Sequence, residues 1–292
     1  MSFQMPRQGS MALAELKRRF GEDWLDWAER WGASQTKILT SQKQYLFAFG
    51  GNGAGKTQLG GYWAKIQLDS FNPLTGEVIE RQHPVTMYCA APTLEKVEGV
   101  MKPSLRQWFP KGVILKETSA AKGDVWHLTE GRRVMWKTGK QDPMTWTGDE
   151  IDAAWVDEEL ASEEHWKRML SRGFRRLARY LTTMTAENGT LWLHNWVFSP
   201  DEYPMEEKDI VQIDTRENPY YSDCDNCSKP KRWHGDSIHK TCAKFSNVKG
   251  QMKIQLRIRQ CSNPYDFEVR IKGSYLLSTG RSVIEPVMRD TA

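Results

Sequence analysis

The stretch that decides the fold is YLFAFGGNGAGKT, residues 45–57. Its last eight residues match the phosphate-loop pattern G-x4-G-K-[ST] without a mismatch. The apolar run at residues 44–49 predicts a strand, and a helix is expected from 56 to about 68. In this order the backbone N–H groups and the helix N-terminus can surround phosphate oxygens. The residues expected to bind a nucleoside triphosphate are Gly50, Gly51, Asn52, Gly53, Ala54, Gly55, Lys56 and Thr57.

The end of this loop and a later acidic pair predict ATP hydrolysis with Mg²⁺. Lys56 should reach the β- and γ-phosphates, and Thr57 should bind the metal. Residues 153–159 read AAWVDEE, an apolar strand that ends in acids. Asp157 would hold Mg²⁺ through water, and Glu158 would polarise the attacking water. Taken alone, such acids are also typical of a helix N-terminus, which favours negative charge.

A threonine-rich segment, TTMTAENG at residues 182–189, directly follows another expected strand. Hydroxyl groups at the end of a neighbouring strand can sense a γ-phosphate, and Thr185 is the candidate. The alternative is an ordinary Thr-rich strand and turn.

Strands and helices alternate through the rest of the chain as far as residue 217, which indicates an α/β fold with a largely parallel sheet flanked by helices. Further strands are expected at residues 84–91, 113–117, 125–128, 133–136, 151–156, 180–185 and 191–198. Further helices are expected at 11–32, 94–108 and 163–176. The predicted segments are a helical segment at 1–32, a core at 33–217, a Cys-rich basic insertion at 218–262 and a C-terminal segment at 263–292.

Composition and charge distribution narrow the class of protein. With 39% hydrophobic residues and 13 Trp among 292 residues, full disorder is excluded. The first ten residues lack the apolar run of a signal peptide, and no stretch is long enough for a membrane span, so we expect a cytosolic protein that is not secreted. Residues 229–260 carry six Lys and three Arg against one acid, a net charge of +8 in a chain of +4. This asymmetry favours a polyanionic partner over a merely solvated surface.

The basic segment also holds a candidate zinc site. Cys224 and Cys227 form one pair and His239 and Cys242 another, a layout that suits tetrahedral Zn²⁺ with a structural role. His234 or Cys261 could replace His239. Reduced cysteines in a basic loop are the alternative, because a cytosolic chain with five Cys does not indicate a disulfide framework. Folded on zinc, this knuckle would present lysines and arginines to DNA phosphates.

Together these motifs resemble the ATPase domain of tailed-phage terminase large subunits. The matching order is FGGNGAGKT, then APT at 91–93, WTGDEIDAAWVDEE at 146–159, RMLSRG at 168–173 and TTMTAENG. The resemblance covers about residues 12–220. It implies a RecA/ASCE-like P-loop NTPase that packages viral DNA into a procapsid.

The resemblance also implies partners and a place of action. The partners would be double-stranded DNA, the portal of the procapsid, the terminase small subunit and other copies of the chain in a ring, a pentamer by family resemblance. The place would be the host cytoplasm, at the portal.

Several residues depart from the family pattern. Asn52 stands where many terminases carry Arg, so an arginine cannot act in cis from that position. Arg172 is the candidate charge-stabilising arginine, with Arg175 and Arg176 behind it, although helix-surface charge is the simpler interpretation. Thr185 and Ala186 resemble the family's coupling motif with Pro replaced. The residue similar to the adenine-contacting Gln is Gln35.

The family's nuclease domain has no counterpart beyond RSVIEPVMRD at 281–290, so nuclease activity is not expected. The chain is then either shortened or one whose nuclease lies on another chain. Two other functions remain open: a helicase-like DNA translocase, and a zinc-bearing DNA-binding module that uses ATP as a switch. Helicases need a second motor lobe, for which 292 residues leave no room. Glu158 argues against a switch.

Overall fold

The computed structural model describes residues 31–119, 123–160, 162–185, 190–199, 204–218 and 248–275, with only the backbone over 248–252. The expected helix at 11–32 lies almost wholly outside this set. The chain divides into two compact units. The first contains Leu39–Gln44 and Thr57–Thr182, and the second contains residues 31–38, Tyr45–Lys56 and the residues from Thr183 onward.

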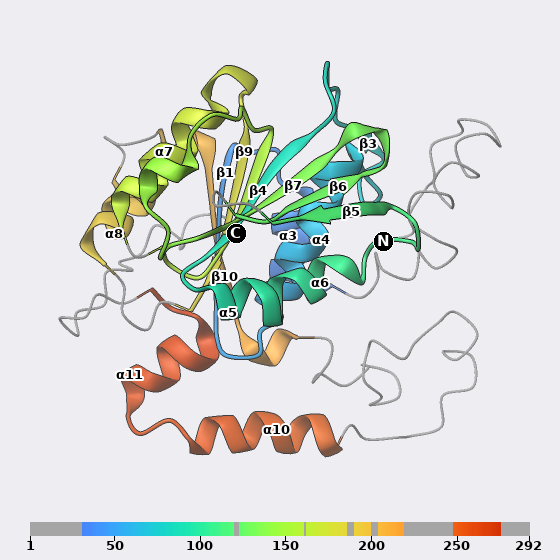
Figure 1. Ribbon diagram of the computed structural model, residues 1–292. Coiled ribbons are helices and arrows are strands. Elements are labelled where there is room, and N and C mark those ends of the chain that lie inside the picture. Colours follow the sequence, from blue (N-terminus) through green and yellow to red (C-terminus); the bar gives the residue numbers. More distant parts are fainter. Residues whose placement is uncertain are drawn as a thin grey trace, which may run out of the picture. The chain divides into compact units, whose positions relative to one another are not determined.

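The first unit is built on a mostly parallel sheet, flanked by helices (Figure 1). Its central strand β4 runs parallel to β7 on one side and to β8 on the other, while β5 and β6 pair antiparallel at one end. Every residue of β4 and β8 is buried, as expected for central strands that are covered on both faces. In order across the sheet, the strands are β9 (Arg179–Met184), β8 (Ala153–Asp157), β4 (Thr86–Ala91), β7 (Arg133–Thr138), β6 (Val125–Leu128) and β5 (Ile114–Thr118).

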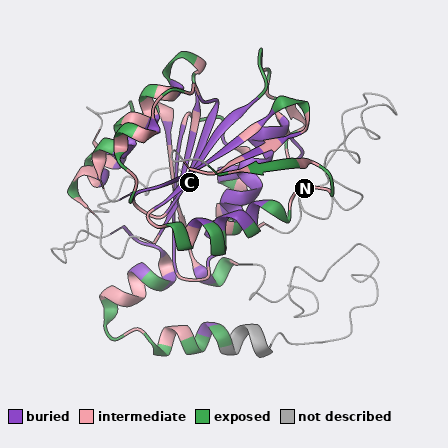
Figure 2. Ribbon diagram, in the orientation of Figure 1, coloured by how far each residue is buried: buried purple, intermediate pink, exposed green. Residues whose placement is uncertain are grey.

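Helix α4 (Lys56–Asp69) packs against β8 of this sheet. A Cβ on Gly60 would overlap the indole of Trp155, so the helix can approach the strand this closely only with glycine at that position. The helix is buried along most of its length, as Figure 2 shows, and its polar Lys65 and Asp69 form an ion pair. This packing brings Thr57, at the start of α4, beside the carboxyl end of β8.

The other helices of the first unit follow the strands in short segments. The expected helix at 94–108 is observed as α5 (Leu94–Lys96), the π-helix η1 (Val97–Met101) and α6 (Lys102–Arg106). The expected helix at 163–176 is observed as α7 (Glu163–Gly173) and the 3-10 turn η4 (Phe174–Arg176). The remaining elements are the 3-10 turns η2 (Thr129–Gly131) and η3 (Pro143–Trp146) and the antiparallel pair β2 (Phe71–Asn72) and β3 (Glu77–Val78).

The second unit is organised around β1 (Tyr45–Gly50), which pairs in parallel with β10 (Lys208–Ile213). Phe49 contacts Phe198 and Tyr275, with ring centroids 6.2 and 5.0 Å away. Tyr275 Oη also donates to Thr190 O at 3.0 Å, so the C-terminal part of this unit is held to β1 and to the start of α8. Its helices are α3 (Ala33–Thr40), α8 (Leu191–Phe198), η5 (Met205–Glu207), η6 (Thr215–Glu217), α10 (Val248–Arg259), α11 (Pro264–Phe267) and the π-helix η8 (Glu268–Lys272).

Two predictions about this unit are wrong. Residues 191–198 were expected to form a strand, but they form helix α8. Leu193, Trp196 and Val197 are buried there, and these three positions lie on one face of a helix. A short run of apolar residues does not show from the sequence whether its buried positions have the period of a helix or of a strand. The strand β10 was missed, because Lys208 and Asp209 interrupt its apolar pattern.

Candidate functional site

The predicted phosphate loop, residues 50–57 (called the loop below), lies in the second unit up to Lys56, whose side chain is buried within it. Lys56 Nζ donates to Gly50 O at 2.9 Å and Gly51 O at 3.0 Å. It also donates to Thr185 Oγ1 at 2.6 Å. The threonine predicted to sense the γ-phosphate therefore contacts the lysine predicted to bind it. Thr185 Oγ1 also reaches Asn52 Oδ1 at 3.4 Å, so the turn after β9 and the loop share contacts.

Three side chains from distant parts of the second unit donate to consecutive carbonyls of the loop. Such donors hold the loop in one shape before any ligand arrives, since buried backbone carbonyls require partners. Sequence reasoning missed Asn218 and Arg257, which no motif marks. The pairs are Gln35 Nε2 to Ala54 O at 2.9 Å, Asn218 Nδ2 to Gly53 O at 2.5 Å and Arg257 Nη1 to Asn52 O at 2.9 Å.

Gln35, predicted to contact adenine, is placed next to the loop with both ends of its amide engaged. It is 3% exposed, and its Oε1 accepts from Gly32 N at 3.0 Å while its Nε2 supports Ala54. The structure therefore shows Gln35 as a support of the loop.

The C-terminal part of the second unit packs directly on the loop. Asn52 N donates to Arg270 O at 2.7 Å, and a Cβ on Gly51 would overlap the carbonyls of Arg270 and Ile271. Gly273, at a φ of +74°, approaches the loop from the same side. Gly51 is thus needed because η8 approaches the loop closely. The phosphate-loop pattern alone does not require glycine at this position.

The acidic pair lies in the first unit, at the carboxyl end of β8. Thr57 Oγ1 donates to Asp157 Oδ2 at 3.1 Å, and Asp157 is fully buried. Glu158 follows with a φ of 69°, a left-handed conformation that is strained for a residue with a side chain and that occurs often at functional sites. Lys96 Nζ lies 3.1 Å from Glu158 Oε1 and 3.7 Å from Asp157 Oδ2. Sequence reasoning missed Lys96, which follows the APT motif without a recognisable pattern.

The candidate arginines lie near the opposite end of β8 from this acidic pair. Ile151 N donates to Arg172 O at 3.1 Å, and Arg176 Nη1 pairs with Asp152 Oδ2 at 2.9 Å. Both partners precede the strand. Because a strand rises about 3.3 Å per residue, the two ends of β8 are about 13 Å apart. The structure therefore does not bring Arg172, Arg175 or Arg176 together with the acidic pair of the same chain.

The predicted zinc ligands Cys224, Cys227, His239 and Cys242, and the alternative His234, lie outside the described residues. The other alternative, Cys261, is described. Its Sγ donates to Arg257 O at 3.5 Å, and burial, with the nearby Asp266, raises the pKa of the Cys261 thiol.

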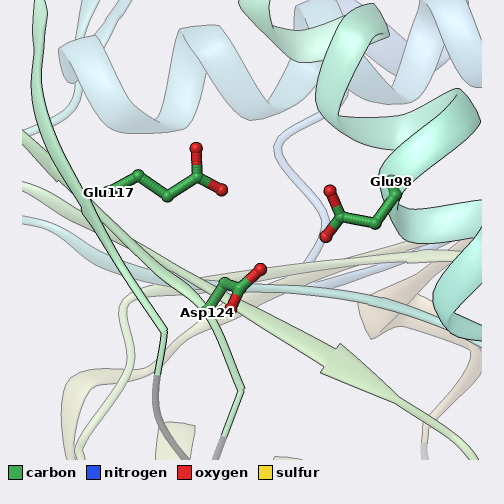
Figure 3. A group of neighbouring side chains, drawn as sticks. All are labelled: Glu98, Glu117 and Asp124. Carbon is green, nitrogen blue, oxygen red and sulfur yellow. The ribbon is translucent and has the colours of Figure 1, made fainter.

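Three further acids of the first unit, Glu98, Glu117 and Asp124, point toward one another, as Figure 3 shows. Lys102 Nζ lies 2.6 Å from an oxygen of each. Burial alone lowers the pKa of Lys102, but its hydrogen bonds to the three carboxylates outweigh this and raise it above the ordinary value. An ammonium group thus already lies among the three carboxylates, at the place a metal ion would take, and we interpret this cluster as structural.

The remaining groups are suited to phosphate chemistry. The second unit contains a glycine loop with a buried lysine. The first unit contains, by itself, a hydroxyl group beside two carboxylates. Anions are stabilised by such loops, and Thr and Asp oxygens are ligands that Mg²⁺ prefers.

Comparison with known families gives an independent result. Residues 48–223 match the family described as terminase large subunit, T4likevirus-type, N-terminal. No curated protein sequence matches the chain. None of the described helices is long and apolar enough to cross a membrane.

Three solved structures have a similar fold at low sequence identity. The first is the large terminase from a thermophilic bacteriophage in complex with ADP, with a TM-score of 0.57 and 15% identity over 84% of this chain and 53% of that chain. The second is the large terminase ATPase domain of Thermus phage P74-26, with a TM-score of 0.51 and 10% identity over 90% of this chain and 98% of that chain. The third is the HK97 bacteriophage large terminase, with a TM-score of 0.52 and 12% identity over 83% of this chain and 50% of that chain. The chain spans about half the length of the first and third.

Proposed function

Because this chain belongs to the family of T4likevirus-type terminase large subunits, we propose that it hydrolyses ATP to move double-stranded DNA into a viral procapsid. One observation carries the proposal: two consecutive residues, Lys56 and Thr57, each contact a residue that the sequence predicts to act in ATP hydrolysis. Lys56 contacts Thr185 in the second unit, and Thr57 contacts Asp157 in the first.

The loop and Lys56 are proposed to bind the phosphates. Gly50 O and Gly51 O hold the ammonium of Lys56 inside the loop, and phosphate oxygens would replace these carbonyls as its acceptors. Thr185 already contacts the ammonium and would follow its movement. Gly53 and Gly55 would offer their backbone N–H groups to the phosphates. The N–H of Asn52 donates to Arg270 O at 2.7 Å and that of Ala54 to Gly51 O at 3.0 Å, so these two would have to exchange partners when the nucleotide binds.

The oxygens of Thr57 and Asp157 fit a magnesium ion. Two neighbouring ligands of an octahedral Mg²⁺, each at about 2.1 Å, lie about 3.0 Å apart. Thr57 Oγ1 and Asp157 Oδ2 are separated by 3.1 Å, so we propose that Asp157 binds the metal directly, in place of the water-mediated contact expected from the sequence. When bound, the metal would neutralise the charge that develops on the phosphates. Glu158, beside Asp157, is proposed to orient and deprotonate the attacking water.

Charge stabilisation by arginine is proposed to come from a neighbouring subunit. Arg172 remains the candidate donor, and its place near the opposite end of β8 favours action in trans over action in cis. The proposed partners are the DNA, the portal, the small subunit and further copies of this chain, assembled at the portal in the host cytoplasm. Nuclease activity is not part of the proposal.

The basic segment at residues 229–260 is proposed to contact DNA phosphates, since it carries a net charge of +8. A structural zinc ion bound by Cys224, Cys227, His239 and Cys242 is proposed to fold its first part. The spacing of these residues is the support for this proposal.

The test is the substitution Glu158→Gln, with Glu164→Gln, an exposed position on α7, as the matched control. We expect Glu158→Gln to lower the rate of DNA- and procapsid-stimulated ATP hydrolysis by about 100-fold or more, the usual effect of losing a general base. Affinity for a fluorescent ADP analogue should stay at the wild-type value in both variants. Unchanged hydrolysis in Glu158→Gln would show that another residue activates the water.

A further inference from the structure

Lys96 has an unusual position for a residue outside every recognised motif. It is the last residue of α5, directly after β4, and Thr93 Oγ1 accepts from its backbone N–H at 3.3 Å. This N-cap holds the backbone of Lys96 at the carboxyl end of β4, next to the end of β8. The side chain is therefore directed to the acidic pair by the start of its own helix.

The ammonium of Lys96 faces the same atom that the metal is proposed to bind. Asp157 Oδ2 accepts the hydroxyl of Thr57 at 3.1 Å and lies 3.7 Å from Lys96 Nζ. A divalent cation bound to these two oxygens would have a second positive charge within a few ångströms. Two like charges at that distance repel measurably even where water screens them well.

Lys96 also contacts the proposed base. Its Nζ lies 3.1 Å from Glu158 Oε1, and both side chains are partly exposed, 26% for Lys96 and 28% for Glu158. A carboxylate paired with an ammonium is held in place by that contact. The contact thus favours an arrangement in which the Glu158 carboxylate is paired with Lys96 while no metal is present.

Lys102, in the same helical segment, is a structural lysine with which the exposure and contacts of Lys96 can be compared. Lys102 is only 6% exposed in its side chain and is held by three carboxylates at 2.6 Å. Lys96 is more exposed, its carboxylate contacts are longer, and the π-helix η1 begins immediately after it. Irregular turns of this kind are frequent at functional sites.

We propose that Lys96 is a displaceable counter-ion: it pairs with Asp157 and Glu158 in the metal-free protein, competes with the divalent cation and moves away when the metal-nucleotide complex binds. The inference rests on the proposed function, since that function assigns the metal to Thr57 and Asp157. Lys96 acts on the metal through Asp157 and on the attacking water through Glu158, and it is therefore a positioning residue.

The experiment is a titration of the full chain with Mn²⁺, a paramagnetic substitute for Mg²⁺, in which free Mn²⁺ is followed by electron paramagnetic resonance. One series uses nucleotide-free protein and a second contains ADP. The variants are Lys96→Met, Lys96→Arg, which keeps the charge, and Lys116→Met, which removes an exposed lysine of β5.

In the nucleotide-free series, Lys96→Met should bind Mn²⁺ about tenfold more tightly than the wild type, because a competing charge about 4 Å away is removed. Lys96→Arg and Lys116→Met should keep the wild-type affinity. If ADP strengthens Mn²⁺ binding to the wild type but Lys96→Met binds Mn²⁺ no more tightly than the wild type, the inference about Lys96 is overturned and the proposed function still stands. If ADP does not strengthen Mn²⁺ binding to the wild type, the proposed function itself fails.

Discussion

Substitution of Gly273, far from the phosphate loop in the sequence, should damage the loop. Gly273 has a φ of +74°, where an alanine is strained by about 1–2 kcal/mol. A Cβ there would lie 2.6 Å from Gly50 Cα and 2.8 Å from Phe49 O. Both are backbone atoms, which cannot rotate aside, and overpacking of this kind typically costs about 1–3 kcal/mol. Together these effects should lower the free energy of unfolding of Gly273→Ala by about 3 kcal/mol.

The control is Gly112→Ala. Gly112 also has a positive φ, +87°, but nothing lies within 4 Å of its missing Cβ. Only the backbone strain applies there, so the expected loss is about 1 kcal/mol. The difference between the two variants, about 2 kcal/mol, isolates the close approach of Gly273 to the loop.

The assay is urea unfolding, combined with the affinity for a fluorescent ADP analogue. If the loop moves to relieve about half of the strain, ADP should bind Gly273→Ala about tenfold more weakly, because ~1.4 kcal/mol corresponds to a factor of ten. Gly112→Ala should bind ADP as the wild type does. Equal stability losses and equal ADP affinities in the two variants would refute the view that residues 268–275 support the loop.

Two further predictions concern the lysine-centred acid cluster and the cysteine segment. Lys102→Met should lower the free energy of unfolding at pH 7 by about 2 kcal/mol, less than for a fully buried pair because Glu98, Glu117 and Asp124 are 23–46% exposed in their side chains. In the wild type, burial raises the pKa of Glu117 and Asp124, but hydrogen bonds to Lys102 lower it by more, so the net pKa shift is downward. This stability is present above the ordinary carboxyl pKa and is lost as the pH falls through the lowered pKa values. In Lys102→Met the crowded carboxylates take raised pKa values, so stability should instead increase as the pH falls from 7 toward 4; urea unfolding across that range measures both slopes, and slopes of the same sign would contradict the assignment. Freshly purified wild type should contain about one zinc ion per chain by elemental analysis and Cys224→Ser should have lost it; a wild type without zinc would disprove the zinc site.

The sequence by itself determined the residues of the phosphate loop and the acidic pair. Lys56 and Thr57 follow from a pattern of eight consecutive residues, and Asp157 from a buried strand that ends in acids. These features are local: a strand, a turn and a helix N-terminus are specified by neighbours in the chain. The parallel arrangement of β4 and β8 was also predictable, because strands buried on both faces are apolar throughout.

The tertiary structure alone decided which distant residues contact the loop and the acidic pair. Asn218 and Arg257 donate to loop carbonyls 165 and 205 positions away, and no local pattern can mark such a partner. Lys96 is an ordinary lysine in the sequence and meets Glu158 only because β4 and β8 are neighbours in the sheet. The helical state of α8 likewise depends on which face is buried, since a run of eight apolar and neutral residues suits a strand or a helix until its packing partner is known.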